Sequence, residues 1–142
     1  LRAFATGTIA LHPGLAECND VDNGVAIIEF EGGAKAVIYA SRTLAHGHET
    51  STEIIGTAGK LLIGAGAARD RVVASDASGV RHVALEDFWE RFADAFGHEM
   101  DAFAAACLGH ASAPLRLSDA TEATRIAAAL TRSLHSGMPE VV

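Results

Sequence analysis

The chain has 142 residues, 49% of them apolar and 20% charged, a composition that predicts one folded domain over residues 1–142 and excludes a disordered chain. Its 18 acidic and 11 basic residues give a formal charge of −7. Nucleic acid is therefore not an expected partner, because phosphate contacts need clustered Lys and Arg.

Strands are predicted over the first two thirds of the chain, where apolar residues alternate between turn signals. The predicted strand segments are residues 1–11, 25–30, 34–42, 52–55, 60–63, 71–74 and 80–83. The turn His12-Pro13-Gly14 ends the first strand, and residues 15–23 are expected to form a loop. The other strands form hairpins, the first around Gly32-Gly33, which predicts an antiparallel or mixed sheet.

Two helices are predicted over the last third of the chain. Apolar residues recur at three- and four-residue steps from about Glu86, which predicts an amphipathic helix of about 22 residues that ends at Gly109. A second helix is expected to begin at Ser118 or Asp119, either of which can cap it, and to end before Gly137. This order predicts an α+β fold, an open antiparallel or mixed sheet with helices packed on one face, and disfavours a Rossmann alternation of strands and helices.

The opposite face of the predicted sheet carries a large apolar surface. Its side chains are Val25, Ile27, Val37, Tyr39, Leu61 and Ile63. A contiguous exposed apolar patch usually marks an interface between proteins. We therefore expect a homo-oligomer, either a dimer or a tetramer, in which this face meets a second copy of the chain.

Cysteine use and hydropathy predict a cytoplasmic protein. Cys18 lies in a polar, turn-rich stretch and Cys107 at the apolar end of a predicted helix, so both are expected to be free thiols in a reducing compartment. No apolar run approaches the roughly 20 residues needed to cross a bilayer, and residues 1–4 lack the pattern of a signal peptide, so no membrane contact is expected. Because the chain opens without Met on a strand-like segment, we expect it to be part of a longer protein.

Several short motifs follow one another in an order typical of one family. They are Asp22 to Ala34 around the Gly32-Gly33 turn, Ser41-Arg42, Glu53-Ile54-Ile55-Gly56-Thr57-Ala58-Gly59, Phe88-Trp89-Glu90-Arg91-Phe92 with Glu99 and Phe103, and Ser133 to Val141. The third is similar to an E-V-x-G-x-x-G hairpin and the last to an S-x-x-x-G-x-P-V tail. Over nearly its whole length the chain resembles the C-terminal domain of the Gfo/Idh/MocA oxidoreductases, with the inositol and related polyol dehydrogenases as the nearest type.

This resemblance implies a dihydrodipicolinate-reductase-like C-terminal domain without its Rossmann domain. In the family the Rossmann domain binds NAD or NADP, and a Lys from it acts with an Asp/His pair at the beginning of the substrate domain. The chain has no G-x-G-x-x-G after a strand, since Gly64-Ala65-Gly66 lies between predicted hairpins, and no G-x-H-x-x-D. It is therefore expected to hold no cofactor and no catalytic residue, and to be inactive alone.

The resemblance also implies the reaction of the full-length protein. We expect an NAD(P)-dependent oxidoreductase that acts on a secondary alcohol of a cyclic polyol or sugar. A rival hypothesis from another class is a non-enzymatic dimerisation or sugar-binding module.

Arg42, His46 and His48 are the candidate substrate contacts. An imidazole can donate or accept a hydrogen bond with a polyol hydroxyl, and a polyol site needs several such groups. In the inositol dehydrogenases the matching loop carries aromatic residues that line the substrate pocket, and His46 and His48 stand at those places. A solvent-exposed loop is the alternative for both histidines, and an ion pair at the sheet edge is the alternative for Arg42.

Other polar or aromatic clusters favour structural roles. His46 and His48 with Glu49 lack a further ligand at suitable spacing, so no metal is expected. Asp20 and Asp22 are expected to be turn residues that bond their own backbone. An aromatic stripe at helical spacing predicts core packing in place of a cofactor site, and its members are Trp89, Phe92, Phe96 and Phe103.

Overall fold

The computed structural model describes residues 1–43, 45, 47–64 and 68–142, with residues 68–71 described by their backbone alone. The chain divides into two compact units. The first comprises residues 1–43 and 113–142, and the second comprises residues 44–112. Within the described residues, no helix has the length and apolar character needed to span a membrane.

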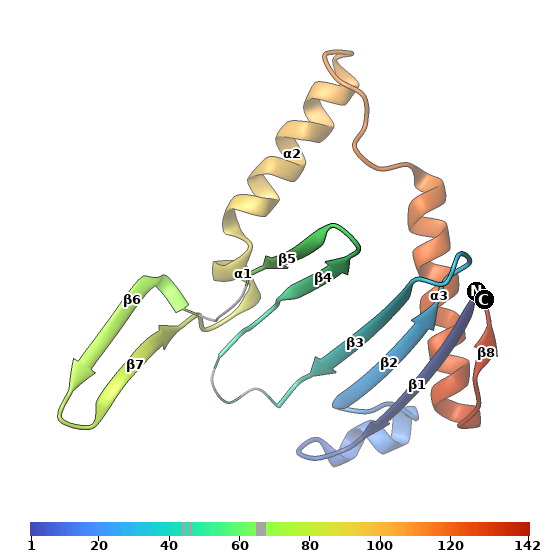
Figure 1. The fold of residues 1–142 in the computed structure, drawn as a ribbon, viewed down its shortest axis with the longest axis horizontal. Helices are drawn as coiled ribbons and strands as arrows, with labels where there is room; N and C mark the ends of the chain where they lie inside the picture. Colours follow the sequence, from blue (N-terminus) through green and yellow to red (C-terminus); the bar gives the residue numbers. More distant parts are fainter. Residues whose placement is uncertain (44, 46, 65–67) are drawn as a thin grey trace. The chain divides into compact units, whose positions relative to one another are not determined.

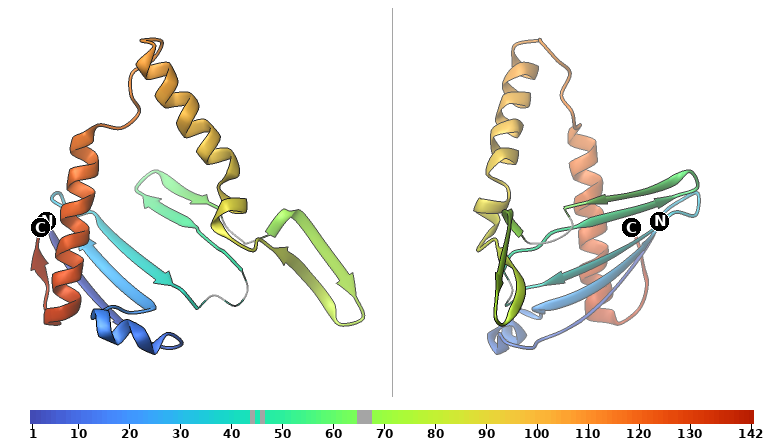
Figure 2. Two further views of the ribbon diagram at one scale, coloured as in Figure 1. Left: turned by 180° about the vertical axis from the view of Figure 1, so that it is seen from behind. Right: turned by 60° about the vertical axis from the view of Figure 1, so that its left-hand side comes forward.

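A four-stranded antiparallel sheet with the strand order β3-β2-β1-β8 forms the first unit (Figure 1). Its strands are β1 (Arg2–Thr8), β2 (Asn23–Glu29), β3 (Lys35–Ser41) and β8 (Glu140–Val141). The predicted turn between β2 and β3 is confirmed, and Gly32 and Gly33 have φ angles of 87° and 91°, which side chains disfavour. The β8 strand was not predicted, and its pairing with β1 brings the two termini side by side (Figures 1 and 2).

The connection from β1 to β2 contains a 3₁₀ helix, η1 (Pro13–Cys18), where the sequence analysis predicted a loop. That prediction was wrong for residues 15–18. Pro13 supplies the helical φ angle at the first turn, and Asn19 ends the helix in the left-handed conformation with φ 52°. The β1 strand also ends at Thr8, earlier than predicted, because the next amides bind a buried carboxylate described below.

Helix α3 (Leu117–Ser136) lies across one face of the four-stranded sheet (Figure 2). Small side chains allow this close approach, since Ala129 of the helix and Ala3 of β1 are both buried. The predicted end at Gly137 is confirmed, with φ 70°. The predicted cap was wrong: the helix is capped at Arg116, whose backbone N–H donates to the Asp119 carboxylate at 3.0 Å.

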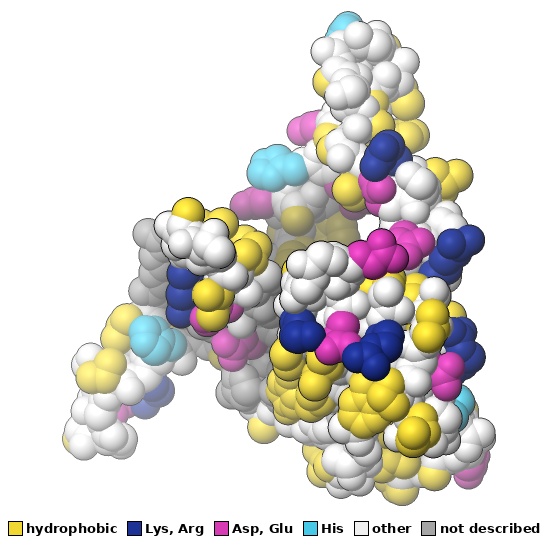
Figure 3. Space-filling model, turned by 45° about the vertical axis from the view of Figure 1, so that its right-hand side comes forward, with side chains coloured by type: hydrophobic (Ala, Val, Ile, Leu, Met, Phe, Trp, Pro, Cys, Tyr) yellow, Lys and Arg dark blue, Asp and Glu magenta, His cyan; other side chains and the backbone are white. Residues whose placement is uncertain are grey.

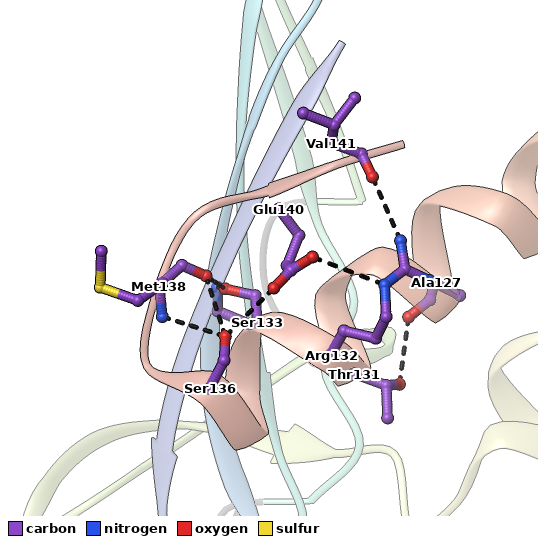
Figure 4. Close-up of polar contacts among 9 residues, drawn as sticks. Ala127, Thr131, Arg132, Ser133, Ser136, Met138, Glu140 and Val141 are labelled. Carbon is purple, nitrogen blue, oxygen red and sulfur yellow. Dashed lines mark hydrogen bonds and ion pairs between the residues drawn. The ribbon is translucent and has the colours of Figure 1, made fainter.

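Ser133 connects three parts of the first unit (Figure 4). Its hydroxyl is fully buried, donates to the Met138 carbonyl at 2.7 Å and accepts from the Ala5 N–H at 3.0 Å. The tail that follows is held by Arg132, whose guanidinium donates to the Val141 carbonyl at 3.1 Å and lies 3.6 Å from the Glu140 carboxylate. These contacts join α3, β1 and the C-terminal tail.

The second unit consists of two separate hairpins and two helices (Figure 1). Its elements are β4 (Thr52–Gly56), β5 (Gly59–Ile63), β6 (Ala68–Asp76), β7 (Gly79–Ala84), α1 (Phe88–Arg91) and α2 (Ala93–Cys107). The predicted hairpins are confirmed, although their strands do not join the four-stranded sheet. The prediction of one long helix was wrong, because Phe92 leaves the helical region with φ −113° and ψ 17° and divides it. Apolar spacing does not reveal this break, since the three- and four-residue steps continue across Phe92 in the sequence.

The aromatic stripe predicted to pack in a core is largely exposed. Trp89 and Phe103 are 62% and 63% exposed. Trp89 stacks on Phe88 and Phe96 with centroid distances of 4.6 and 5.3 Å. The described strands of this unit pair only as separate hairpins, so they form no layer that covers the stripe.

The α+β fold class is confirmed, with antiparallel pairing in every described strand pair and a helix on one face of the main sheet. The assignment of residues 1–142 to a single domain stays a prediction.

Replacing Ser133 by Ala should destabilise the protein. The substitution removes two partly buried hydrogen bonds and leaves the Ala5 N–H and the Met138 carbonyl without their partner, which costs about 1–3 kcal/mol. Urea unfolding of the full-length protein measures the change. Ser118→Ala, at an exposed position of the same helix, is the control and should alter the free energy of unfolding by less than about 0.5 kcal/mol. Equal effects of the two substitutions would contradict the role of Ser133.

Candidate functional site

The buried carboxylate of Asp22 organises one end of the first unit. Asp22 precedes β2 and is 2% exposed. Its two oxygens accept from three consecutive backbone N–H groups, those of Ala10, Leu11 and His12, at 2.8–3.0 Å. The Asn23 side-chain amide donates to it at 2.8 Å. The backbone after β1 therefore curves around this carboxylate.

These contacts control the charge of Asp22. Burial by itself raises the pKa of a carboxyl, but the backbone amides of Leu11, Ala10 and His12, with the Asn23 amide, outweigh burial and hold the pKa of Asp22 well below its usual range. Asp22 is consequently ionised at neutral pH and already has its hydrogen-bond donors, which suits an anchor and not a general base. The expectation that Asp22 bonds the backbone of its own turn was wrong, because its carboxylate binds the amides of residues 10–12, earlier in the chain.

Asp22 also positions the walls of an open hollow in the first unit. Its side chain binds the His12 amide, and its carbonyl accepts from the Arg42 N–H at 2.8 Å. The hollow has a volume of about 740 Å³ and is lined by residues 11–15 and Arg42. Among the described residues, none pairs with the Arg42 guanidinium by a hydrogen bond or ion pair, so the predicted alternative of an ion pair at the sheet edge is not seen there. Its exposed N–H groups can donate to the oxygen atoms of a ligand.

His48 lies in the second unit, in the segment between β3 and β4. Its backbone N–H donates to the Leu85 carbonyl at 2.9 Å, and the edge of its ring meets the Phe92 ring at a centroid distance of 5.8 Å and an interplanar angle of 79°. The ring nitrogen Nδ1 is buried and has no hydrogen-bond partner among the described residues. Nε2 is therefore the ring nitrogen that can reach a ligand.

Gly47 allows this approach of the two segments. Its φ of 98° is disfavoured for residues with side chains. A Cβ at this position would also collide with the Leu85 carbonyl oxygen and lie 2.9 Å from the Ala84 Cβ. The glycine that the sequence places between two histidines is thus required by the backbone beside Leu85.

The predicted site residues are distributed over both units. Arg42 belongs to the first unit and His48 to the second. His46 lies outside the described residues, as do Ala65 and Gly66 of the glycine-containing stretch. No local pattern in the sequence points to His12, because its place beside Arg42 depends on the bond from its backbone N–H to Asp22. The described residues contain no cluster of three or more His, Cys, Asp or Glu suited to a metal ion.

The sequence matches a known domain family over residues 5–142. The matching description is "Oxidoreductase family, C-terminal alpha/beta domain". The chain belongs to the Gfo/Idh/MocA oxidoreductase family. The family membership predicted from the short motifs is thereby confirmed, and Asp22, Arg42 and His48 all fall within the matched domain.

Two curated relatives of this family domain are inositol dehydrogenases. The chain is 34% identical over 134 residues to scyllo-inositol 2-dehydrogenase (NAD(+)) of Bacillus subtilis (strain 168), a match that spans 94% of the chain and 39% of that protein. It is 30% identical over 103 residues to myo-inositol 2-dehydrogenase of Thermotoga maritima, spanning 72% of the chain and 30% of that protein. The chain therefore corresponds to less than half the length of either relative.

A solved structure has the same fold as the family domain. The crystal structure of scyllo-inositol dehydrogenase from Lactobacillus casei with bound NAD(H) and scyllo-inositol matches with a TM-score of 0.90 and 29% identity. The match spans 97% of the chain and 41% of that protein.

Replacing Asp22 by Asn should weaken folding at neutral pH and flatten its dependence on pH. Because the folded-state pKa of Asp22 is depressed, its contribution is present above the usual pKa of about 4 and is lost as the pH falls below it. Urea midpoints measured between pH 7 and about pH 2 should therefore fall more steeply for the parent than for the variant.

Asp20→Asn is the matched control for this experiment. Its carboxylate accepts only the adjacent Val21 N–H at 2.8 Å in the described structure. It should retain the parental pH profile. A parental profile for Asp22→Asn as well would show that its buried carboxylate does not anchor the fold.

Proposed function

We propose that this chain is the substrate-side domain of an NAD- or NADP-dependent dehydrogenase that oxidises a secondary alcohol of a cyclic polyol of the inositol type, or catalyses the reverse reduction. The observation that carries the proposal is the likeness, over nearly the whole chain, to the solved scyllo-inositol dehydrogenase that holds NAD(H) and scyllo-inositol. The cofactor and the catalytic groups belong to other parts of the full-length enzyme. The chain alone is inactive, and the enzyme acts in the cytoplasm.

Within this enzyme, the chain binds and orients the polyol. Each ring hydroxyl can both donate and accept, so a polyol site needs donors and acceptors aimed at several oxygens. The Arg42 guanidinium supplies unpaired donors at the hollow in the first unit. His48 presents Nε2, which donates or accepts according to the protonation of the ring. His46 is the third contact.

A panel of cyclic and open-chain polyols tests this function. The full-length enzyme should reduce its nicotinamide cofactor with inositols and not with open-chain polyols of similar size, as followed by nicotinamide absorbance. Arg42→Gln and His48→Gln should each lower kcat/KM for the inositol by about 10- to 100-fold, the range expected for losing a hydrogen bond to substrate, with an unchanged KM for the nicotinamide.

Arg125→Gln is the control for Arg42→Gln, because Arg125 is exposed on α3 and pairs only with Glu122 in the described structure. It should leave both parameters at the parental values. A full-length protein that turns over no cyclic polyol with either cofactor would overturn the proposal and favour the non-enzymatic dimerisation or sugar-binding module.

The outer face of the four-stranded sheet, opposite α3, is the proposed oligomer interface. Phe4, Ile27 and Val37 lie in register across β1, β2 and β3. Val25 and Tyr39 occupy the next row, and Val37 and Tyr39 are 72% and 64% exposed. Figure 3 shows hydrophobic side chains gathered beside a row of charged ones on this unit. The predicted members Leu61 and Ile63 lie elsewhere, on the β4–β5 hairpin.

Polar side chains at both ends of this face satisfy one another. At one end, the Glu29 carboxylate accepts from Lys35 at 2.7 Å and from Arg2 Nε at 2.9 Å. At the other, the Asn23 side-chain oxygen accepts from the Ser41 and Thr43 hydroxyls at 2.6 and 3.1 Å. An apolar centre with internally paired polar ends suits burial against a second copy of the chain.

The double variant Val37→Glu with Tyr39→Glu should dissociate the full-length oligomer. Two carboxylates in the apolar centre would have to lose water without a partner, which disfavours association. Size-exclusion chromatography with light scattering measures the mass. Ala123→Glu, exposed on α3, adds a similar charge away from this sheet face and should leave the mass unchanged. A parental mass for the double variant would exclude this face as the interface.

A further inference from the structure

Arg91 bridges two backbone carbonyls of the second unit. It is the last residue of α1, and its Nη2 donates to the carbonyls of Thr50 and Gly64 at 2.8 Å each. Thr50 precedes β4 and Gly64 follows β5. One guanidinium therefore connects both ends of the β4–β5 hairpin to α1.

The helix that carries Arg91 is itself held in place. The Asp87 carboxylate accepts from the Glu90 N–H at 2.9 Å and caps α1. The Glu90 carboxylate accepts from the Glu86 N–H at 3.1 Å. These two bonds hold residues 86 and 87 against the first turn of α1. The position of Arg91 is thus determined locally, within six residues of sequence.

The same stretch of chain also contacts His48 directly. The Leu85 carbonyl accepts from the His48 N–H at 2.9 Å, and the Phe92 ring meets the His48 ring. Arg91 donates a hydrogen bond to the carbonyl of Thr50, two residues after His48. Gly47, one residue before His48, fits against Leu85 only because it lacks a Cβ. Residues 85–92 therefore bind residues 47–50 at both ends, with the His48 side chain between them.

The His48 ring needs such support. Its Nδ1 is buried without a hydrogen-bond partner among the described residues, an arrangement that costs free energy and persists only where the surroundings hold it. A ring released from Phe92 could turn Nδ1 toward water. The held orientation keeps Nδ1 inward and leaves Nε2 available.

We infer that Arg91 is a positioning residue for His48, which acts by holding the Thr50 carbonyl so that the imidazole stays packed on Phe92 with Nε2 presented to the polyol. This inference rests on the proposed function, in which His48 binds a substrate hydroxyl. Arg91 itself touches no substrate. The guanidinium is suited to the task because its planar fork can satisfy carbonyls from two segments at once.

Arg91→Met in the full-length enzyme tests the inference, because it keeps much of the apolar stem and removes the donors. The ring nitrogen signals of His48, assigned by comparison with His48→Gln after ring labelling with ¹⁵N, should shift. The KM for the inositol should rise roughly tenfold, and the KM for the nicotinamide should stay unchanged. Arg91→Lys, which keeps the cation, should show the same changes to a smaller extent and serves if Arg91→Met does not fold.

Arg81→Met is the matched control. Arg81 lies in the same unit and forms an exposed ion pair with Asp76, so its loss should move neither the His48 signals nor the KM for the inositol.

A double variant separates positioning from a general structural role. If Arg91 acts through His48, adding Arg91→Met to His48→Gln should raise the KM for the inositol no further. A full additional tenfold rise, or unchanged His48 signals in Arg91→Met, would overturn the inference. If the enzyme oxidises no inositol at all, the proposed function fails, and the His48 signals still decide whether Arg91 positions the ring.

Discussion

The first unit depends on the hydrogen bonds that three consecutive backbone N–H groups donate to the buried Asp22 carboxylate. Because Asp22 takes the amides of Ala10, Leu11 and His12, the β1 strand ends and the chain turns toward η1. The backbone carbonyl of Asp22 accepts a hydrogen bond from the backbone N–H of Arg42. One residue before β2 therefore sets the backbone on both sides of the hollow, and its ionised state is maintained by the bonds that it makes.

The second unit uses backbone carbonyls in a similar way. Leu85 accepts from the His48 N–H, and Thr50 and Gly64 accept from Arg91. These bonds connect segments that no sheet or helix joins, since the described hairpins pair only within themselves. Both units thus place a candidate binding side chain by fixing the backbone beside it. Such an arrangement suits the proposed role of a domain that orients a substrate.

Apolar surface is distributed unequally over the chain. The outer face of the main sheet combines exposed Val37 and Tyr39 with polar groups that are paired at both ends, which supports the proposed interface. In the described part of the chain, the rings of the aromatic stripe contact one another at Phe88, Trp89 and Phe96, and Phe92 contacts the His48 ring. A helical period of apolar residues indicates that a face avoids water, but it does not identify the surface that covers it.

Alternation of apolar residues, glycine turns and the change to a helical period were enough to locate nearly every strand and both helical regions, because these signals depend on neighbours a few residues apart. The same local motifs identified the family and placed Arg42 and His48 among its candidate contacts. Sequence alone did not reveal η1, the break at Phe92 or the β8 strand. It also missed the anchoring of residues 10–12 by Asp22 and of Thr50 by Arg91. Each of these features depends on a hydrogen bond or ring contact between residues far apart in the chain, or on one backbone angle, and only the tertiary structure decides which donor meets which acceptor.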